Sequence, residues 1–400
     1  MKGRHKYFLF FAALVLIIVS GCAKPKIRCA SPEDNPAHHY LRGMELLEAS
    51  DLTGARAKFE RSLLCDEKFS PSYGGLAIVD GLDGAAAGGA GEKLADSAYR
   101  GLKKAGKLSK TPEEVFAWRL ARMRVNTALK PGKWLKKVER DFNKAAKIKV
   151  DEKKLIYYRD SGAAPYFMGL AYLEGGEFEQ ARIRFNDVLK AGATGKWNGP
   201  ADLGWKKADR ALRSLGGMTV GEIAKEMVLK DSVTRGELAA ILADELRIER
   251  LFSGRLSSKK ARKPPAFVPY DIEDNPFKEE ILTVIGFGIR GLEPLYDSTR
   301  KAYRFSPDGL VSRKEFAFVV EDILINITGD EGLATAFVGH RESPFPDVSP
   351  TAPWYNAVMN AVTRDIMETG VSGEFRPEDN VDGPDLLLAI RVLRQRLNIN

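Results

Sequence analysis

Apolar residues in the C-terminal third of the chain recur at the spacing of one helix face. These positions are Leu238, Ile241, Leu242 and Leu246 in one stretch, and Phe316, Val319, Val320 and Ile323 in another. Residues three and four apart lie on the same side of an α-helix. Both stretches therefore predict amphipathic helices, each with one face turned toward a core.

A loose internal repeat surrounds these helices. Its copies share an acidic-aliphatic pair, a Phe-x-Pro element and a polar turn that opens a helix. In the two clearest copies these elements lie at 271–272, 305–307 and 311–315, and at 347–348, 375–377 and 381–385. A third copy, at 231–237, keeps only the turn and its helix. Because one repeat rarely buries its apolar face alone, we expect the three copies to pack together.

The turns have a physical interpretation. Thr234 and Ser312 can each cap the following helix, and Glu237 and Glu315 lie three residues on, as in a capping box. These residues resemble the S-layer homology (SLH) family, whose modules typically come in threes and bind cell-wall polymers non-covalently. The resemblance covers roughly residues 218–397 and implies three helical SLH-like modules over 217–400.

The resemblance also implies binding residues. In that family the arginine of the turn contributes to a polymer-binding groove, and a guanidinium can hold a carboxylate through two parallel bonds. The residues implied are Thr234, Arg235, Glu237, Ser312, Arg313, Glu315 and Trp354. Alternatively, each arginine pairs with a nearby acid at an interface, and Trp354 packs beneath its helix. Gly383 and Pro384 replace the arginine motif in the last copy, so its groove is expected to be degenerate.

The stretch 35–216 predicts helices without alternating strands. Ala55, Phe59 and Ser62 follow Gly43 by 12, 16 and 19 positions, and a second set repeats these offsets after Gly169. This pattern resembles the tetratricopeptide repeat (TPR), in which small residues let two antiparallel helices approach. It implies a helical solenoid that holds a protein partner. A generic helical hairpin is the alternative.

The first residues predict a targeting segment. Basic residues precede an apolar run, 8–19, that is too short to span a membrane comfortably. The run ends in Val19-Ser20-Gly21-Cys22, which resembles a bacterial lipobox with an acylated Cys22. We therefore expect a signal peptide at 1–21, a tether at 22–34, and lipid anchoring on the periplasmic face of the outer membrane. An ordinary signal peptide or an uncleaved anchor is the alternative.

The net charge and the cysteine content of the chain say little about its function. Loss of residues 1–21 removes three cations and no acid, so the formal charge falls from +8 to +5. Lysines are dense between 103 and 154. They could form a basic face that meets an anionic polymer, a lipid or an acidic partner, or they could form only a solvated helix face.

Cys29 and Cys65 could pair in an oxidising periplasm or stay free. Ser257 to Pro265 predicts an exposed linker.

No catalytic pattern stands out. The glycine-rich run 84–91 lacks the ending of a phosphate loop and is expected to connect two helices. His38 and His39 are adjacent and so point to different helix faces, without further metal-ligand spacing. We therefore expect a non-enzymatic protein without cofactor or metal. It either anchors the outer membrane to peptidoglycan or serves as an assembly or secretion accessory. A wall-modifying enzyme is the weakest possibility.

Overall fold

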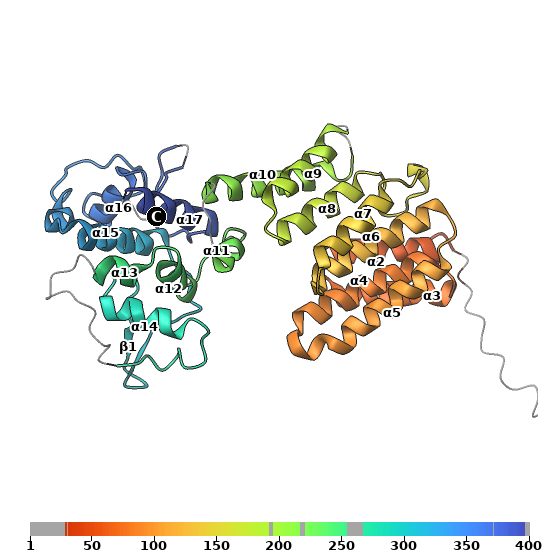
Figure 1. Ribbon diagram of the computed structural model, residues 1–400, viewed down its shortest axis with the longest axis horizontal. Coiled ribbons are helices and arrows are strands. Elements are labelled where there is room, and N and C mark those ends of the chain that lie inside the picture. Colours follow the sequence, from red (N-terminus) through yellow and green to blue (C-terminus); the bar gives the residue numbers. More distant parts are fainter. Residues whose placement is uncertain are drawn as a thin grey trace, which may run out of the picture. The chain divides into compact units, whose positions relative to one another are not determined.

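The computed structural model describes residues 29, 31–191, 195–216, 221–253, 267–370 and 372–396. The chain is mainly helical, as the sequence predicts, and forms two compact units (Figure 1). The first unit contains the residues up to 175 together with 183–202, and the second contains 176–182 and the residues from 203 onward. The expected signal peptide, Cys22 and the 257–265 linker lie outside the described residues. No helix among the described residues is long and apolar enough to cross a membrane.

The first unit consists of successive helices, most of them joined by short turns, with a longer connection over 146–162. They are α2 (Pro36–Glu48), α3 (Leu52–Cys65), α4 (Ser70–Ala86), α5 (Glu92–Leu108), α6 (Pro112–Leu129), α7 (Trp134–Ala145) and α8 (Ala163–Glu174), with short 3₁₀ turns at Gly88–Gly91 and Glu152–Lys154. Helices α9 (Phe178–Lys190) and α10 (Asn198–Leu215) follow, and each contributes residues to both units. The glycine-rich run connects α4 to α5, as predicted.

The same close helix crossing occurs twice in this unit. A Cβ added at Gly43 would lie 2.6 Å from the Phe59 ring, and one added at Gly169 would lie 2.6 Å from the Phe185 ring. Both phenylalanines are completely buried. The spacing that suggested a repeat therefore marks two hairpins, α2–α3 and α8–α9, in which a missing side chain makes room for an aromatic ring.

The N-terminal end of this unit is cross-linked. Cys29 and Cys65 form a disulfide with Cα atoms 5.4 Å apart, which resolves the choice between paired and free thiols. Beside it, Arg61 and His39 both bond to the Asp34 carboxylate at 2.7–3.0 Å. The bonds from Arg61, and then from His39, hold the pKa of Asp34 below its ordinary value. His39 thus belongs to a hydrogen-bonded cluster around Asp34.

The second unit is built from shorter helices and one hairpin. Its elements are α11 (Glu222–Met227), α12 (Arg235–Asp244), α13 (Ile248–Ser253), α14 (Lys278–Phe287), β1 (Leu295–Asp297), β2 (Ala302–Arg304), α15 (Arg313–Thr328), a 3₁₀ turn (Glu331–Thr335), α16 (Tyr355–Val362) and α17 (Gly383–Arg396). Strands β1 and β2 pair antiparallel, with Tyr296 opposite Tyr303.

Three equivalent valines join the repeat copies at the centre of this unit. The amide of Val311 donates to the carbonyl of Val233, that of Val381 to Val311, and that of Val233 to Val381, at 2.9–3.0 Å. This closed ring of backbone bonds satisfies donors and acceptors that burial would otherwise leave unpaired. Helices α12, α15 and α17 start directly after the ring. The three turns found in the sequence therefore form one pseudo-threefold arrangement.

Candidate functional site

The turns that open α12 and α15 are capping boxes, as predicted. Thr234 accepts a bond from the Glu237 amide and the Glu237 carboxylate accepts one from the Thr234 amide at 2.9 Å. Ser312 and Glu315 repeat the arrangement. Each box satisfies helix N-terminal donors that have no partner within the helix. These four residues thus fix the directions in which the following arginines point.

Each Phe-x-Pro element is held by the aspartate of its own copy. The Asp271 carboxylate accepts bonds from the amides of Phe305 and Ser306 at 2.9 and 2.7 Å. Asp347 does the same for the amides of Phe375 and Arg376, at 2.9 and 2.6 Å. Asp271 and Asp347 therefore support the turns at these two elements.

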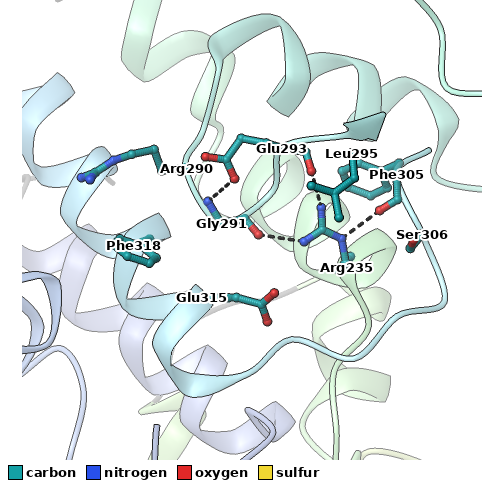
Figure 2. Close-up of a pocket in the computed structure, with 9 residues that line it drawn as sticks. All are labelled: Arg235, Arg290, Gly291, Glu293, Leu295, Phe305, Ser306, Glu315 and Phe318. Atoms are coloured by element: carbon teal, nitrogen blue, oxygen red, sulfur yellow. Dashed lines mark hydrogen bonds between the residues drawn. The ribbon is translucent and has the colours of Figure 1, made fainter. Parts of the chain in front are cut away.

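The two motif arginines insert into the neighbouring copy. Arg235 donates to the backbone carbonyls of Phe305, Gly291 and Glu293 at 2.8–3.0 Å (Figure 2). Its side chain is half-buried and its guanidinium lies 4.8 Å from the Phe305 ring. Burial lowers the pKa of Arg235, and the nearby carboxylates, Glu315 first, oppose the shift. Arg235 thus joins the copy whose turn lies at 231–237 to the next copy along the chain, which begins at 271.

Arg313 makes the equivalent connection one copy later. It is 3% exposed and donates to the carbonyls of Phe375 at 2.7 Å and Glu368 at 2.5 Å, and to the Asp385 carboxylate at 3.1 Å. Burial lowers its pKa, against the pull of Asp385. Most of its hydrogen-bonding capacity is used inside the protein, which leaves little for a bound molecule.

A cleft of about 550 Å³ opens beside Arg235. Its lining comes from α12, α15 and the segment around β1, and consists of Arg235, Arg290, Gly291, Glu293, Leu295, Phe305, Ser306, Glu315 and Phe318 (Figure 2). Leu295 is 73% exposed, whereas Phe305 is buried beneath the guanidinium. The cleft therefore combines apolar surface with two cations and two carboxylates.

The second cation of the cleft is also paired. Arg290 bonds to Asp322 at 2.9 Å and to the buried Glu321 at 2.5 Å, and its guanidinium points away from Arg235 (Figure 2). Glu321 also accepts bonds from the amides of Asn356 and Asn360. The Glu293 carboxylate accepts a bond from the Gly291 amide at 2.7 Å, and the Glu315 carboxylate belongs to its capping box. Because two carboxylates balance the two arginines of the lining, the cleft has no excess of positive charge.

The turn of the last copy is packed differently. A Cβ at Gly383 would overlap the carbonyl oxygen of Met227, so a side chain does not fit where the motif arginine is missing. Arg210, from α10, instead bonds to Asp382 at 2.8 Å and Asp385 at 2.7 Å. A neighbouring helix thus packs against the turn of the copy in which Gly383 and Pro384 replace the arginine motif.

The aromatic candidate lies apart from the cleft. Trp354 directly precedes α16 and is partly buried. The Lys314 ammonium lies over its ring, 4.9 Å from the ring centre. The cleft thus gathers Arg235 and Glu315 from the sequence-implied residues, while Arg313 and Trp354 lie elsewhere in the unit. Arg290, Glu293 and Phe318 were missed, since no spacing rule links them to the turns. Whether the implied residues bind polymer stays a prediction.

One comparison with known proteins gives a match. The S-layer homology domain matches residues 344–383, which include the Phe-x-Pro element of the last copy and the start of α17. No curated protein and no solved structure matches the chain. The chain thus contains one SLH domain, a module that indicates association with the cell envelope and binding to the cell wall in general.

Proposed function

We propose that this protein is a non-enzymatic anchor that binds a cell-wall polymer through the Arg235 cleft, which lies between two SLH-like copies. The observation that carries the proposal is the cleft itself, located where one motif arginine enters the next copy. The SLH match in the adjoining copy supports the assignment of this unit to the wall. The three copies then act as one domain because their turns share the valine ring.

The chemistry of the cleft suggests which part of a polymer it holds. Phe318 and Leu295 offer apolar surface for the faces of sugar rings, while Glu293 and Glu315 can accept bonds from hydroxyl or amide groups. Both cations already have partners, so a strongly anionic chain would gain little here. We therefore place the uncharged sugar portion of peptidoglycan, or of a related wall polymer, in the cleft.

The rest of the chain completes the anchor. The lipobox-like sequence ending at Cys22 supports attachment to the periplasmic face of the outer membrane by acyl chains, which anchor firmly when more than one is present. The hairpins with Gly43 and Gly169 support a TPR-like first unit, which we propose holds a protein partner.

A second function has one specific observation in its favour. Arg210 bonds to the turn of the last copy and Arg313 is bonded to protein groups, so neither of these two turns presents a free motif arginine. A protein that assists assembly or secretion, with the second unit serving only as a protein-interaction surface, would need no open groove at all.

Co-sedimentation with purified peptidoglycan sacculi separates these functions. The whole chain, kept in a non-ionic detergent, is expected to sediment with sacculi at both 50 mM and 500 mM salt, because contacts with uncharged sugars are not screened. A second preparation of sacculi, from which acid has removed the covalently attached secondary polymers, is tested beside the intact one. Comparing the two shows whether the ligand is peptidoglycan or an attached polymer. Failure to sediment with either preparation at either salt concentration would overturn the anchor proposal and leave the accessory function.

A further inference from the structure

A second concave site lies in the first unit, along helix α6. Trp118, Arg122 and Asn126 are four residues apart and so form one stripe on that helix. Helix α5 and Lys137 of α7 form the sides. The full lining of this cleft of about 420 Å³ is Tyr99, Leu102, Lys103, Gly106, Lys107, Trp118, Arg122, Asn126 and Lys137. We call it the α6 groove.

The floor of the groove is rigidly built. The Trp118 indole donates to the carbonyl of Leu102 at 2.9 Å, and a Cβ at Gly106 would lie 2.6 Å from its ring. Arg119 packs over the ring at 4.2 Å and bonds to the buried Asp141 at 2.7 Å. The glycine thus lets an aromatic ring form the surface of the groove, and the arginine holds that ring in place.

The charge of the groove is strongly one-sided. Four of its nine lining residues are cations and none is an acid. Asp141 bonds to Arg122 at 2.9 Å and balances part of the charge. Within the described part of the chain, Lys103, Lys107 and Lys137 have no ion-pair partner. A cleft lined in this way attracts anions and favours a ligand that carries several negative charges.

We propose that the α6 groove binds an acidic peptide segment of a protein partner, a proposal that rests on the partner-holding role of the first unit. The carboxylates of the segment pair with Lys103, Lys107 and Lys137, and its apolar atoms lie on Trp118. The stripe from Trp118 to Asn126 is about 12 Å long at 1.5 Å per residue, which matches about four residues of extended chain. A flat anionic membrane surface would not reach the floor of such a concave site.

The test uses the whole chain in a non-ionic detergent and fluorescein-labelled hexaglutamate, with fluorescence anisotropy as the readout. Hexaglutamine is the uncharged probe. The double variant Lys103→Gln/Lys107→Gln removes two lining charges. The matched control, Lys136→Gln/Lys144→Gln, removes the same charge from exposed positions of α7 outside the groove. Circular dichroism checks that both variants stay folded.

Hexaglutamate is expected to bind the wild type, and hexaglutamine is not. The groove variant should bind hexaglutamate about tenfold more weakly, as expected for two partly exposed ion pairs, and the control within about twofold. Equal loss in both variants, equal binding of the two peptides, or no binding of hexaglutamate would overturn the proposal. Tighter binding of glycerol phosphate than of hexaglutamate would also overturn it, in favour of a lipid headgroup.

This outcome is separable from that of the polymer proposal. The groove variant should still sediment with sacculi at 500 mM salt, because the Arg235 cleft is untouched. Loss of sedimentation together with loss of hexaglutamate binding would show that the groove binds wall polymer instead of a protein partner.

Discussion

Replacing Arg313 by methionine tests whether the motif arginines act as structural links between copies. Methionine keeps much of the side-chain length but none of the donors. Three bonds disappear, and the carbonyls of Phe375 and Glu368 lose the charged donors that satisfy them. Asp385 keeps its second partner, Arg210, and is 29% exposed, so it is not left isolated.

The expected cost follows from these contacts. Removing one partner from a buried charged cluster typically destabilises a protein by about 3–5 kcal/mol. Since a unit of this size changes its melting temperature by about 2–4 °C per kcal/mol, the transition of the second unit should fall by about 6–20 °C. Arg313→Lys should recover only part of this loss, because an ammonium lacks the planar fork that reaches two carbonyls.

Differential scanning calorimetry of the whole chain measures the effect, and hydrogen–deuterium exchange locates it in the second unit. Arg341→Met is the matched control, since Arg341 is exposed, and its melting temperature should stay within about 2 °C of the wild type. An Arg313→Met protein that melts like the wild type but no longer sediments with sacculi would refute the reasoning. Arg313 would then be a ligand contact and not a link.

Three further predictions concern single features. Gly383→Ala should lower the stability of the second unit by about 1–3 kcal/mol in chemical denaturation, although alanine normally favours helices, because its Cβ meets the carbonyl of Met227; equal or higher stability would contradict the packing. Reducing the Cys29–Cys65 disulfide should destabilise the first unit by up to about 4 kcal/mol in calorimetry, from the loop of 36 residues that it closes, and leave the second transition unchanged. Burial alone would raise the pKa of Glu237, but its bonds from a lysine and a backbone amide lower it below 4.5. Its stabilisation is therefore present above pH 4.5 and lost as the pH falls through the folded-state pKa, so the melting-temperature difference between wild type and Glu237→Gln should shrink below that pH; a constant difference would count against the ion pair.

Local features of this chain were predictable from the sequence. The capping boxes of Thr234 and Ser312 depend on residues three positions apart, and the crossing at Gly43 on one helical hairpin. In these cases the interacting groups are close in the chain, so spacing alone indicates the contact.

Long-range contacts were not predictable in the same way. Arg235 bonds to a carbonyl 70 residues away, and Arg210 to a carboxylate 175 residues away. The sequence suggested a nearby acid as the alternative partner of each motif arginine, and Asp385 is one such partner of Arg313. It did not suggest the main-chain carbonyls that Arg235 binds, because backbone carbonyls carry no residue-type signal. The valine ring shows the same limit, because its bonds join main-chain groups that any residue possesses.

The most direct test of the central claim compares two surface variants in sacculus binding. Leu295→Glu puts a charged side chain into the Arg235 cleft, and Val338→Glu makes the same kind of change at another exposed position, 66% accessible, of the second unit. We predict that Leu295→Glu raises the dissociation constant for sacculi at 500 mM salt at least tenfold. The dissociation constant of Val338→Glu should match that of the wild type. Equal binding by both variants would contradict the assignment of the polymer to this cleft.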